Sequence, residues 1–301
     1  MSSAARPAEM GKEKEPQKKM PVLQMVLKGV LLFMLPQLLL MVVNGPVDGN
    51  GDETSGYWGP KTASVNWCER DYVVTHYIAE FANSLTSLII CAFGIYGMYA
   101  HQGAVELRYQ VAFAFFVVVG LGSVAFHGTL LRSMQLLDEL PMVWGNAIFI
   151  YICRTMHDEV GHVRYLECAI LFLATLMATL AIIRFDSDNQ NVFLVCYGSG
   201  VVYLVQQSHG FSALSSPNSS AQMLFTMAMI AYSSGFSLWL VDRNFCTSAR
   251  WLYLHTFWHF GAGFGTFCAV LQWIMVRCQV LQRKSRLQGG LVTWWVEMPQ
   301  K

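Results

Sequence analysis

Long apolar runs separated by short polar segments are the feature of this sequence that most restricts its fold. About 20 consecutive apolar residues cross the hydrocarbon core of a bilayer as a helix, which satisfies its own backbone hydrogen bonds there. The runs lack the alternation of apolar and polar residues that marks the strands of membrane barrels. They therefore predict an all-α, polytopic membrane helix bundle with seven core transmembrane helices. We expect these helices at residues 76–98, 110–130, 138–153, 165–183, 191–207, 221–241 and 251–276.

The composition supports a membrane protein and argues against several other classes. Charged residues make up 13% of the 301 residues and hydrophobic residues 54%. Soluble globular domains carry about 25% charged residues, so a soluble chain of this composition would have too few charges to cover its surface. The formal net charge of +1 gives no basic field that would attract nucleic acid. The eight cysteines include no CxxC pair, which argues against a zinc ribbon.

The N-terminal part of the chain differs from the seven-run core. Its first 20 residues are polar and rich in lysine, whereas a further apolar run follows, interrupted by one lysine and one proline. The length of that run favours an extra transmembrane helix or signal anchor, and the alternative is a signal peptide. We expect a basic disordered cytosolic arm at 1–21, the extra helix at 22–43, a linker and acidic loop at 44–75, the seven-helix core at 76–276 and a basic cytosolic tail at 277–301.

The distribution of lysine and arginine predicts how the bundle is oriented. The N-terminal arm and the tail from Arg277 onward each hold five of these residues. Cytosolic segments of membrane proteins are enriched in both residue types, so both termini are expected in the cytosol. The helix ends that carry His127, Asp138 and His255 then lie on the opposite side, which is the lumenal side in a secretory membrane.

Three histidines from helices far apart in the sequence are predicted to meet at that side. His255 and His259 are four residues apart, so they project from one face of a helix and could share an ion. His127 lies at the same depth on the third of the expected spans when the N-terminal run is counted. Three histidines form a ligand set of catalytic zinc sites that keep one position open. The alternative is that these side chains only form hydrogen bonds between helices.

Two further polar residues accompany the histidines. Ser123 is four residues before His127, which places its hydroxyl beside the first ligand. Asp138 is predicted at the start of the next span, after a short link. A carboxylate at this position could take a proton from a zinc-activated water and pass it to a leaving group.

A second polar cluster precedes the first core helix. Asn66, Glu69, Asp71 and Glu80 offer hard oxygen ligands with three carboxylates, a combination that suits calcium. The segment is no EF-hand, because glycine is missing from the position where the sharp turn of that motif requires it. On spacing alone, the simpler interpretation is a polar loop that places negative charge near a helix N-terminus.

Four blocks of the sequence match a known family. They are GYWGPKTASVNWCERDYVVTHYIAEFANS (56–84), GSVAFHGTLLRSMQLLDELPM (122–142), DRNFC (242–246) and HTFWHFGAG (255–263). In these blocks the chain resembles the alkaline ceramidases, integral membrane amidases of the ceramidase and adiponectin-receptor superfamily. The resemblance covers residues 56–280, and the order and spacing of the blocks agree.

The resemblance implies a role for each candidate site residue. It implies zinc bound by His127, His255 and His259, with Ser123 and Asp138 as catalytic residues. The family usually has Asp in place of Asn66 and Asn in place of Asp71, and this exchange preserves the charge of the ligand set. The resemblance therefore changes our interpretation of the acidic loop to a calcium site, with the ligands Asn66, Trp67 (through its carbonyl), Glu69, Asp71 and Glu80.

The resemblance also implies a disulfide between Cys68 and Cys246. Related enzymes carry cysteines at both places, and both residues fall in segments predicted on the oxidising lumenal side. The bridge would tie the acidic loop to the connection before the last helix. The other six cysteines are expected to be small packing residues: Cys91, Cys153, Cys168, Cys196, Cys268 and Cys278.

The function implied by the resemblance is that of a zinc-dependent, calcium-stimulated intramembrane amidase. It would hydrolyse the N-acyl bond of ceramide taken from the bilayer, with phytoceramide or unsaturated ceramides as candidate substrates, in the endoplasmic reticulum or Golgi. No nucleic acid and no protein partner is implied. The alternative is a receptor-like, lipid-sensing member of the superfamily with a structural zinc, and the NWCERDY loop favours the ceramidase branch. An ester hydrolase is a further alternative, whereas a proton-coupled transporter lacks the expected inverted repeat.

Overall fold

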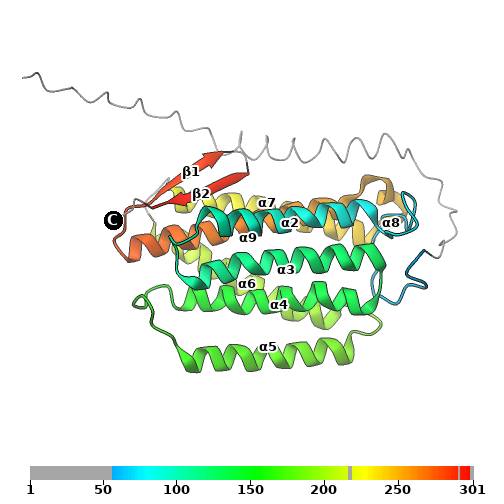
Figure 1. The fold of residues 1–301 in the computed structure, drawn as a ribbon, viewed down its shortest axis with the longest axis horizontal. Coiled ribbons are helices and arrows are strands. Elements are labelled where there is room, and N and C mark those ends of the chain that lie inside the picture. Colours follow the sequence, from blue (N-terminus) through cyan, green and yellow to red (C-terminus); the bar gives the residue numbers. More distant parts are fainter. Residues whose placement is uncertain (1–55, 216–218, 291, 299–301) are drawn as a thin grey trace, which may run out of the picture.

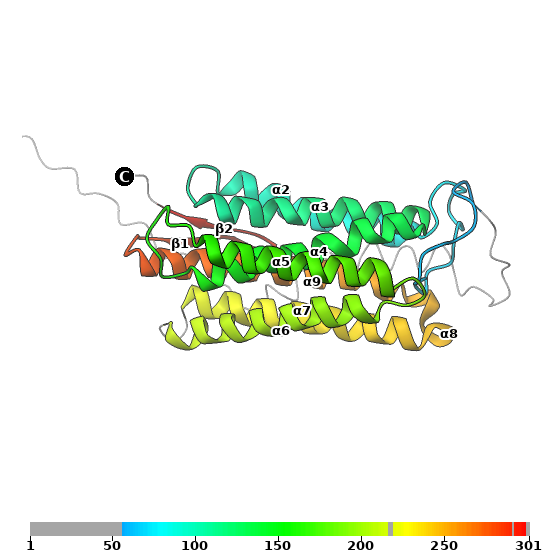
Figure 2. The same cartoon turned by 90° about the horizontal axis from the view of Figure 1, so that it is seen from below.

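The computed structural model describes residues 56–215, 219–290 and 292–298. In this part of the chain, seven long helices lie side by side along one axis (Figures 1 and 2). They confirm the predicted all-α bundle, whereas the predicted N-terminal arm and extra helix lie outside the described residues. The long helices are α2 (Phe81–Ala100), α3 (Leu107–Thr129), α4 (Arg132–Arg154), α5 (Tyr165–Phe185), α6 (Asn191–Leu214), α7 (Ser220–Asn244) and α9 (Leu254–Val280).

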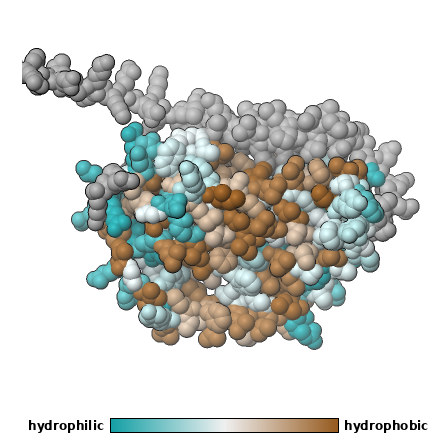
Figure 3. Space-filling model, viewed as in Figure 1, coloured by the Kyte–Doolittle hydropathy of each residue, from teal (hydrophilic) through white to brown (hydrophobic). Residues whose placement is uncertain are grey.

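The lengths and compositions of the helices suit a membrane. Six of the seven long helices are long and apolar enough to cross a bilayer. Helix α6 is long enough but falls short in mean hydropathy, because its second half carries Gln206, Gln207 and His209. The surface shows apolar residues over the middle of the bundle and polar residues toward its two ends (Figure 3). The chain is therefore an integral membrane protein whose helices run across the apolar layer.

Several predicted helix boundaries were wrong by a few residues, among them the starts of α2 and α4 and the end of α6, which extends to Leu214 rather than residue 207. Helix α2 begins at Phe81 rather than at residue 76, because the preceding segment pairs with the end of α3. Ala79 N–H donates to the Gly128 carbonyl at 3.0 Å, and Glu80 N–H donates to the His127 carbonyl at 2.9 Å. These bonds satisfy carbonyls that the end of a helix leaves without partners. Helix α4 begins at residue 132, so Asp138, which the sequence placed at the helix start, lies in its second turn.

Helix α9 is the central helix of the bundle. It contacts α2, α3, α6 and α7. In its apolar stretch of 18 residues, 78% of the residues are buried, against 6% in the corresponding stretch of α5. Small residues allow this close packing. A Cβ atom on Gly261 of α9 would lie 2.6 Å from the Ala231 carbonyl oxygen of α7, closer than van der Waals contact permits. The helix that carries two candidate zinc ligands is therefore held at a fixed depth by close backbone contact.

Short elements close the two ends of the bundle. Helix α8 (Cys246–Ala249) and the 3₁₀ turn η1 (Arg250–Leu252) connect α7 to α9. At the opposite end, β1 (Arg286–Gly290) and β2 (Thr293–Glu297) form an antiparallel hairpin within the segment predicted only as a basic tail. The hairpin contacts α9 and α2, with Val296 only 2% exposed. The sequence did not predict these strands, because two five-residue segments show little of the alternation that indicates a strand.

Candidate metal centre and active site

The three predicted zinc ligands meet inside the bundle. His127 comes from the last turns of α3, whereas His255 and His259 come from the first two turns of α9. All three are buried, and one potential ligand atom from each lies within 4.8 Å of the others. Among the described residues, this is the one group of three or more His, Cys, Asp or Glu side chains that comes so close together. The geometry therefore allows one metal ion to be shared by three imidazoles.

Hydrogen bonds orient two of the imidazole rings. His127 Nδ1 bonds to the Glu80 carboxylate, and His259 Nδ1 lies 2.8 Å from Thr86 Oγ1. The Thr86 hydroxyl itself donates to the Ala82 carbonyl, so His259 Nδ1–H is the donor toward Thr86. In both rings Nδ1 is occupied and Nε2 remains as the metal-binding atom. Carboxylate and hydroxyl partners of this kind fix the tautomer of metal-bound histidines.

The third ring is held by stacking. The ring of His255 stacks on the Trp67 ring with centroids 3.9 Å apart. Its Nδ1 atom is buried without a hydrogen-bond partner. A buried polar nitrogen without a partner is costly, and a metal ion would relieve that cost. Three neutral imidazoles with this one unpaired atom fit zinc, whose preferred protein ligands include histidine nitrogens.

Ser123 and Asp138, the two predicted catalytic residues, line the same cavity as His255 and His259. Ser87 Oγ lies 3.0 Å from Ser123 Oγ. The residues that precede Ser123 and Asp138 lie in close contact: a Cβ atom on Gly122 would lie 2.1 Å from the Leu137 carbonyl oxygen. Only glycine permits α3 and α4 to approach so closely at this level.

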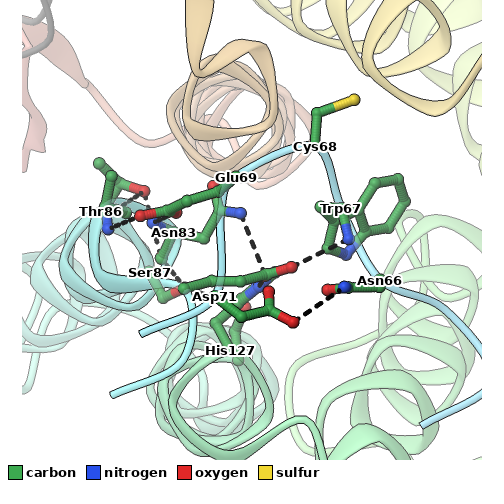
Figure 4. A network of polar contacts seen from close by, with 12 residues as sticks. Asn66, Trp67, Cys68, Glu69, Asp71, Asn83, Thr86, Ser87 and His127 are labelled. Atoms are coloured by element: carbon green, nitrogen blue, oxygen red, sulfur yellow. Dashed lines mark hydrogen bonds and ion pairs between the residues drawn. The ribbon is translucent and has the colours of Figure 1, made fainter. Parts of the chain in front are cut away.

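The predicted calcium ligands belong to one polar network but are engaged with one another and with the backbone (Figure 4). Asn66 Nδ2 donates to the Asp71 carboxylate at 3.1 Å. Trp67 N–H donates to Glu80 Oε1 at 2.9 Å. The Glu69 carboxylate accepts the N–H groups of Ala82 and Asn83, the second and third residues of α2, at 2.6 and 2.8 Å.

The same network fits a cation only in part. The Asn66 side-chain oxygen is buried without a hydrogen-bond partner, as expected of an oxygen ligand awaiting a cation. Burial, followed by the charge of Glu80, raises the pKa of Glu69 to about 8. However, Glu69 caps the N-terminus of α2, which is the simpler interpretation that spacing alone favoured.

Sequence reasoning missed the contacts that organise the histidines. Glu80 was predicted only as a calcium ligand, yet its carboxylate bonds to His127. Thr86 was not considered, although it positions His259. The pairing of residues 79 and 80 with the end of α3 brings Glu80 to His127, and such backbone pairing leaves no trace in residue spacing.

The predicted disulfide between Cys68 and Cys246 is confirmed in the structure. The two Cα atoms lie 5.1 Å apart, and the bridge joins the acidic loop to α8. Cys68 N–H also donates to the Asp242 carboxylate at 3.1 Å. The bridge therefore holds the loop against the connection that leads into α9. The six remaining cysteines are unbridged; four of them are buried, as expected of packing residues, whereas Cys196 is half-buried and Cys168 is exposed.

A large cavity adjoins the metal centre. Its volume is about 650 Å³, and its wall comes mainly from α3, α4, α6, α7 and α9. Ser123, Asp138, His255 and His259 line it, and most of the remaining wall is apolar or aromatic. Mostly apolar cavities with a few convergent polar groups are the usual form of small-molecule sites. The cavity can therefore hold alkyl chains while a polar group meets the histidines.

Comparisons with known proteins agree with this geometry. The family model described as Ceramidase matches residues 59–301. The mouse protein alkaline ceramidase 3 is 32% identical over 258 residues, which cover 80% of this chain and 94% of the relative. The yeast protein alkaline ceramidase YPC1 is 26% identical over 242 residues, or 70% of this chain and 76% of the relative. Because the match spans both the bundle and the histidine centre, the chain belongs to the ceramidase family.

Proposed function

We propose that this chain is a zinc-dependent amidase that hydrolyses the N-acyl bond of ceramide to a sphingoid base and a fatty acid. The observation that carries the proposal is the buried histidine group, with Ser123 and Asp138 beside it, at the wall of an apolar cavity. The relatives named alkaline ceramidases supply the substrate class. Phytoceramide and unsaturated ceramides are the proposed substrates within it.

The residues of the chain can be given chemical roles. A zinc ion held by His127, His255 and His259 would supply a Lewis acid that polarises the amide carbonyl and makes water more acidic. The Asp138 carboxylate takes a proton from the attacking water. That proton then passes to the nitrogen of the departing amine. The Ser123 hydroxyl donates a hydrogen bond to the negative charge that develops on the carbonyl oxygen.

The cavity supports a substrate that comes from the bilayer. Val202 of α6 and Phe236 and Leu240 of α7 line the cavity and are 58%, 42% and 41% exposed. These exposed apolar side chains support an opening of the cavity between α6 and α7. In a membrane this opening faces lipid, so an alkyl chain would enter without crossing water.

We further propose that calcium binds the acidic loop and stimulates the enzyme. The proposed ligands are Asn66, Trp67, Glu69, Asp71 and Glu80. The supporting observations are the unpaired Asn66 oxygen and the acidic groups of the network. Calcium would have to share the Glu69 oxygens with the backbone N–H groups that they accept. Because Glu80 also bonds to His127, calcium binding to Glu80 would change the environment of a zinc ligand.

The proposed location is the endoplasmic reticulum or Golgi, with the metal centre toward the lumen and the C-terminus in the cytosol. The excess of lysine and arginine at the termini supports the orientation. The disulfide joins segments at the metal-centre end, which agrees with an oxidising compartment on that side.

The test is a turnover measurement with purified protein. Detergent-solubilised protein is incubated with a panel of ceramides, and free sphingoid base is measured with and without a zinc chelator. We expect release that stops on chelation and returns with added zinc. Asp138→Asn should keep one zinc per chain and lose most turnover, because an amide cannot accept the proton. Zinc-loaded protein that binds ceramide without releasing base would instead support the receptor-like alternative.

A further inference from the structure

One corner of the mostly apolar cavity carries polar side chains that have no role in the proposed reaction. Glu139, Gln190 and Arg243 line the cavity there. They come from three elements that meet at the metal-centre end: α4, the residue before α6, and the last turn of α7. Glu139 follows Asp138 directly in the chain, so the corner adjoins the reacting groups.

Hydrogen bonds hold these three side chains in one chain of contacts. Arg243 Nη1 donates to Gln190 Oε1 at 2.8 Å, and Gln190 Nε2 donates to Glu139 Oε1 at 2.6 Å. Gln135 Nε2, one turn earlier on α4, also donates to Glu139 Oε1 at 2.7 Å. The guanidinium of Arg243 lies over the Trp239 ring, 5.2 Å from its centroid. These contacts therefore hold the side chains of Glu139, Gln190 and Arg243 in a defined arrangement.

The second carboxylate oxygen of Glu139 lacks a donor. Glu139 is 2% exposed, and its Oε2 atom is buried without a hydrogen-bond partner. Arg132 Nη1 forms an ion pair with this oxygen at 3.7 Å, a distance longer than a hydrogen bond. A buried carboxylate oxygen without a donor is unfavourable. Glu139 lines the cavity, so a ligand hydroxyl there would supply the missing donor once the carboxylate turns toward it.

We infer that Glu139, Gln190 and Arg243 form a headgroup subsite that binds the hydroxyl groups of the sphingoid base. The inference rests on the proposed amidase function. In a ceramide, hydroxyl-bearing carbons flank the carbon that carries the amide nitrogen. With the amide held at Asp138 and the histidines, these hydroxyls lie beside the neighbouring residue Glu139. A hydroxyl donates to Glu139 Oε2, and N–H groups of Gln190 or Arg243 donate to a hydroxyl oxygen. The subsite makes the enzyme select hydroxylated amides over plain alkyl amides.

The first test needs only the wild-type protein. The value of kcat/KM is compared for an N-acyl sphinganine, its 1-deoxy and 3-deoxy analogues, and an N-alkyl amide of equal length that lacks both hydroxyls. A hydrogen bond to a charged group predicts a loss of about 10–150-fold for removal of the contacted hydroxyl. Equal kcat/KM for the parent and both deoxy analogues would overturn the subsite and leave the amidase function intact. Turnover of none of the substrates would instead reject the amidase function, and the subsite with it.

The second test separates recognition from folding. Glu139→Gln removes the charge, and Gln190→Met removes the link to Arg243 at similar volume. Both should reduce the preference for the hydroxylated substrate, measured as the ratio of the two kcat/KM values, at least fivefold. The matched controls are Glu167→Gln, a partly exposed acid on α5, and Gln206→Met, an exposed residue on α6, which should keep the wild-type preference. Zinc content and the intact disulfide report folding. Equal loss on every substrate would show a purely structural role and overturn the inference.

Discussion

Two clusters of buried and half-buried charged residues at opposite ends of the bundle are built differently. At the metal-centre end, the Glu80 carboxylate is hydrogen-bonded to His127, and Glu69 accepts backbone N–H groups. At the other end, Glu106 forms ion pairs with Arg108 and Arg277. Burial and Glu80 raise the pKa of Glu69 to about 8. Burial also acts on Glu106, but hydrogen bonds from Arg277 and Arg108 outweigh it and lower its pKa.

The difference shows which end is organised for binding and which for holding the helices together. The Arg277 guanidinium also donates to the carbonyls of Met156 and Asp158, at 2.8 and 2.7 Å. It thus ties α9 to the loop after α4 and to the start of α3. At the metal-centre end, atoms such as His255 Nδ1 and the Asn66 side-chain oxygen are buried without partners. The opposite end also has buried atoms without partners, Arg108 Nε and Tyr109 Oη, so the pairing of charges distinguishes the two ends. A charge-compensated cluster fixes the fold, whereas acidic groups and imidazoles without an arginine partner are suited to receive a metal ion.

The largest expected effect comes from removing one metal ligand. His259→Ala leaves two imidazoles, so we expect loss of zinc together with a fall in kcat/KM of at least about a thousandfold. The reason is that a bound metal lowers the activation barrier by several kcal/mol. Metal analysis and the sphingoid-base assay check this. The control is His209→Ala on the exposed face of α6, which should change neither quantity. Normal turnover with one zinc per chain in His259→Ala would reject the assignment.

The next largest effect should appear at the opposite end. Arg277→Met leaves Glu106 with one arginine and removes the bonds to two carbonyls, so we expect a loss of about 3 kcal/mol of stability. Zinc content per folded chain should stay unchanged, because the metal centre lies at the other end. Arg154→Met, which breaks the more exposed pair with Glu167, should cost less than about 1 kcal/mol. Thermal unfolding in detergent measures both variants. Zinc loss in Arg277→Met would show that the two ends are not separable.

A smaller effect separates the two roles of Glu69. Glu69→Ala removes both the charge and the cap of α2, with an expected stability cost of about 1 kcal/mol. Glu69→Gln retains an oxygen acceptor, so it should recover part of that stability while still weakening the response to calcium. Calcium titrations of turnover and of the melting temperature make the comparison. If both variants respond to calcium like the wild type, Glu69 is a cap and no ligand.

The sequence predicted the fold well where the apolar pattern is long. The seven expected spans all correspond to observed helices, because about 20 apolar residues leave few alternatives in a bilayer. The boundaries of α2 and α4 were less predictable. The start of α2 depends on backbone bonds from Ala79 and Glu80 to the end of α3, a contact between segments about 50 residues apart. The hairpin of residues 286–297 was missed, because each of its strands has five residues.

The candidate site was predicted in its residue types but not in its connections. The i, i+4 spacing of His255 and His259 and the common depth of His127 identified the histidine group. The ring orientations depend on Glu80 and Thr86, which reach the rings only after the helices pack. Likewise, the chain of contacts from Arg243 to Glu139 joins helices about 100 residues apart and has no local signature.

The smallest expected effect concerns a histidine at the end opposite the metal centre. His101, just after α2, is fully buried; its Nδ1–H donates to the Gly97 carbonyl at 2.8 Å, and its Nε2 accepts the Val296 N–H at 3.0 Å. Burial lowers the pKa of His101, and the bond to Gly97 offsets this only partly. The docked hairpin therefore requires neutral imidazole.

The sign of the pH dependence follows from that depressed pKa. The undocked histidine binds a proton at higher pH than the docked one, so the contribution to hairpin docking is full above about pH 6.5 and declines as the pH falls below it. Hydrogen exchange of residues 286–297 should speed up severalfold between pH 7.5 and 5.5, after correction for intrinsic rates. His101→Gln, whose carbonyl accepts the Val296 N–H at any pH, should remove this dependence. A hairpin whose protection ignores pH in the wild type would show that the His101 bond contributes little, and that arginine pairs alone hold this end.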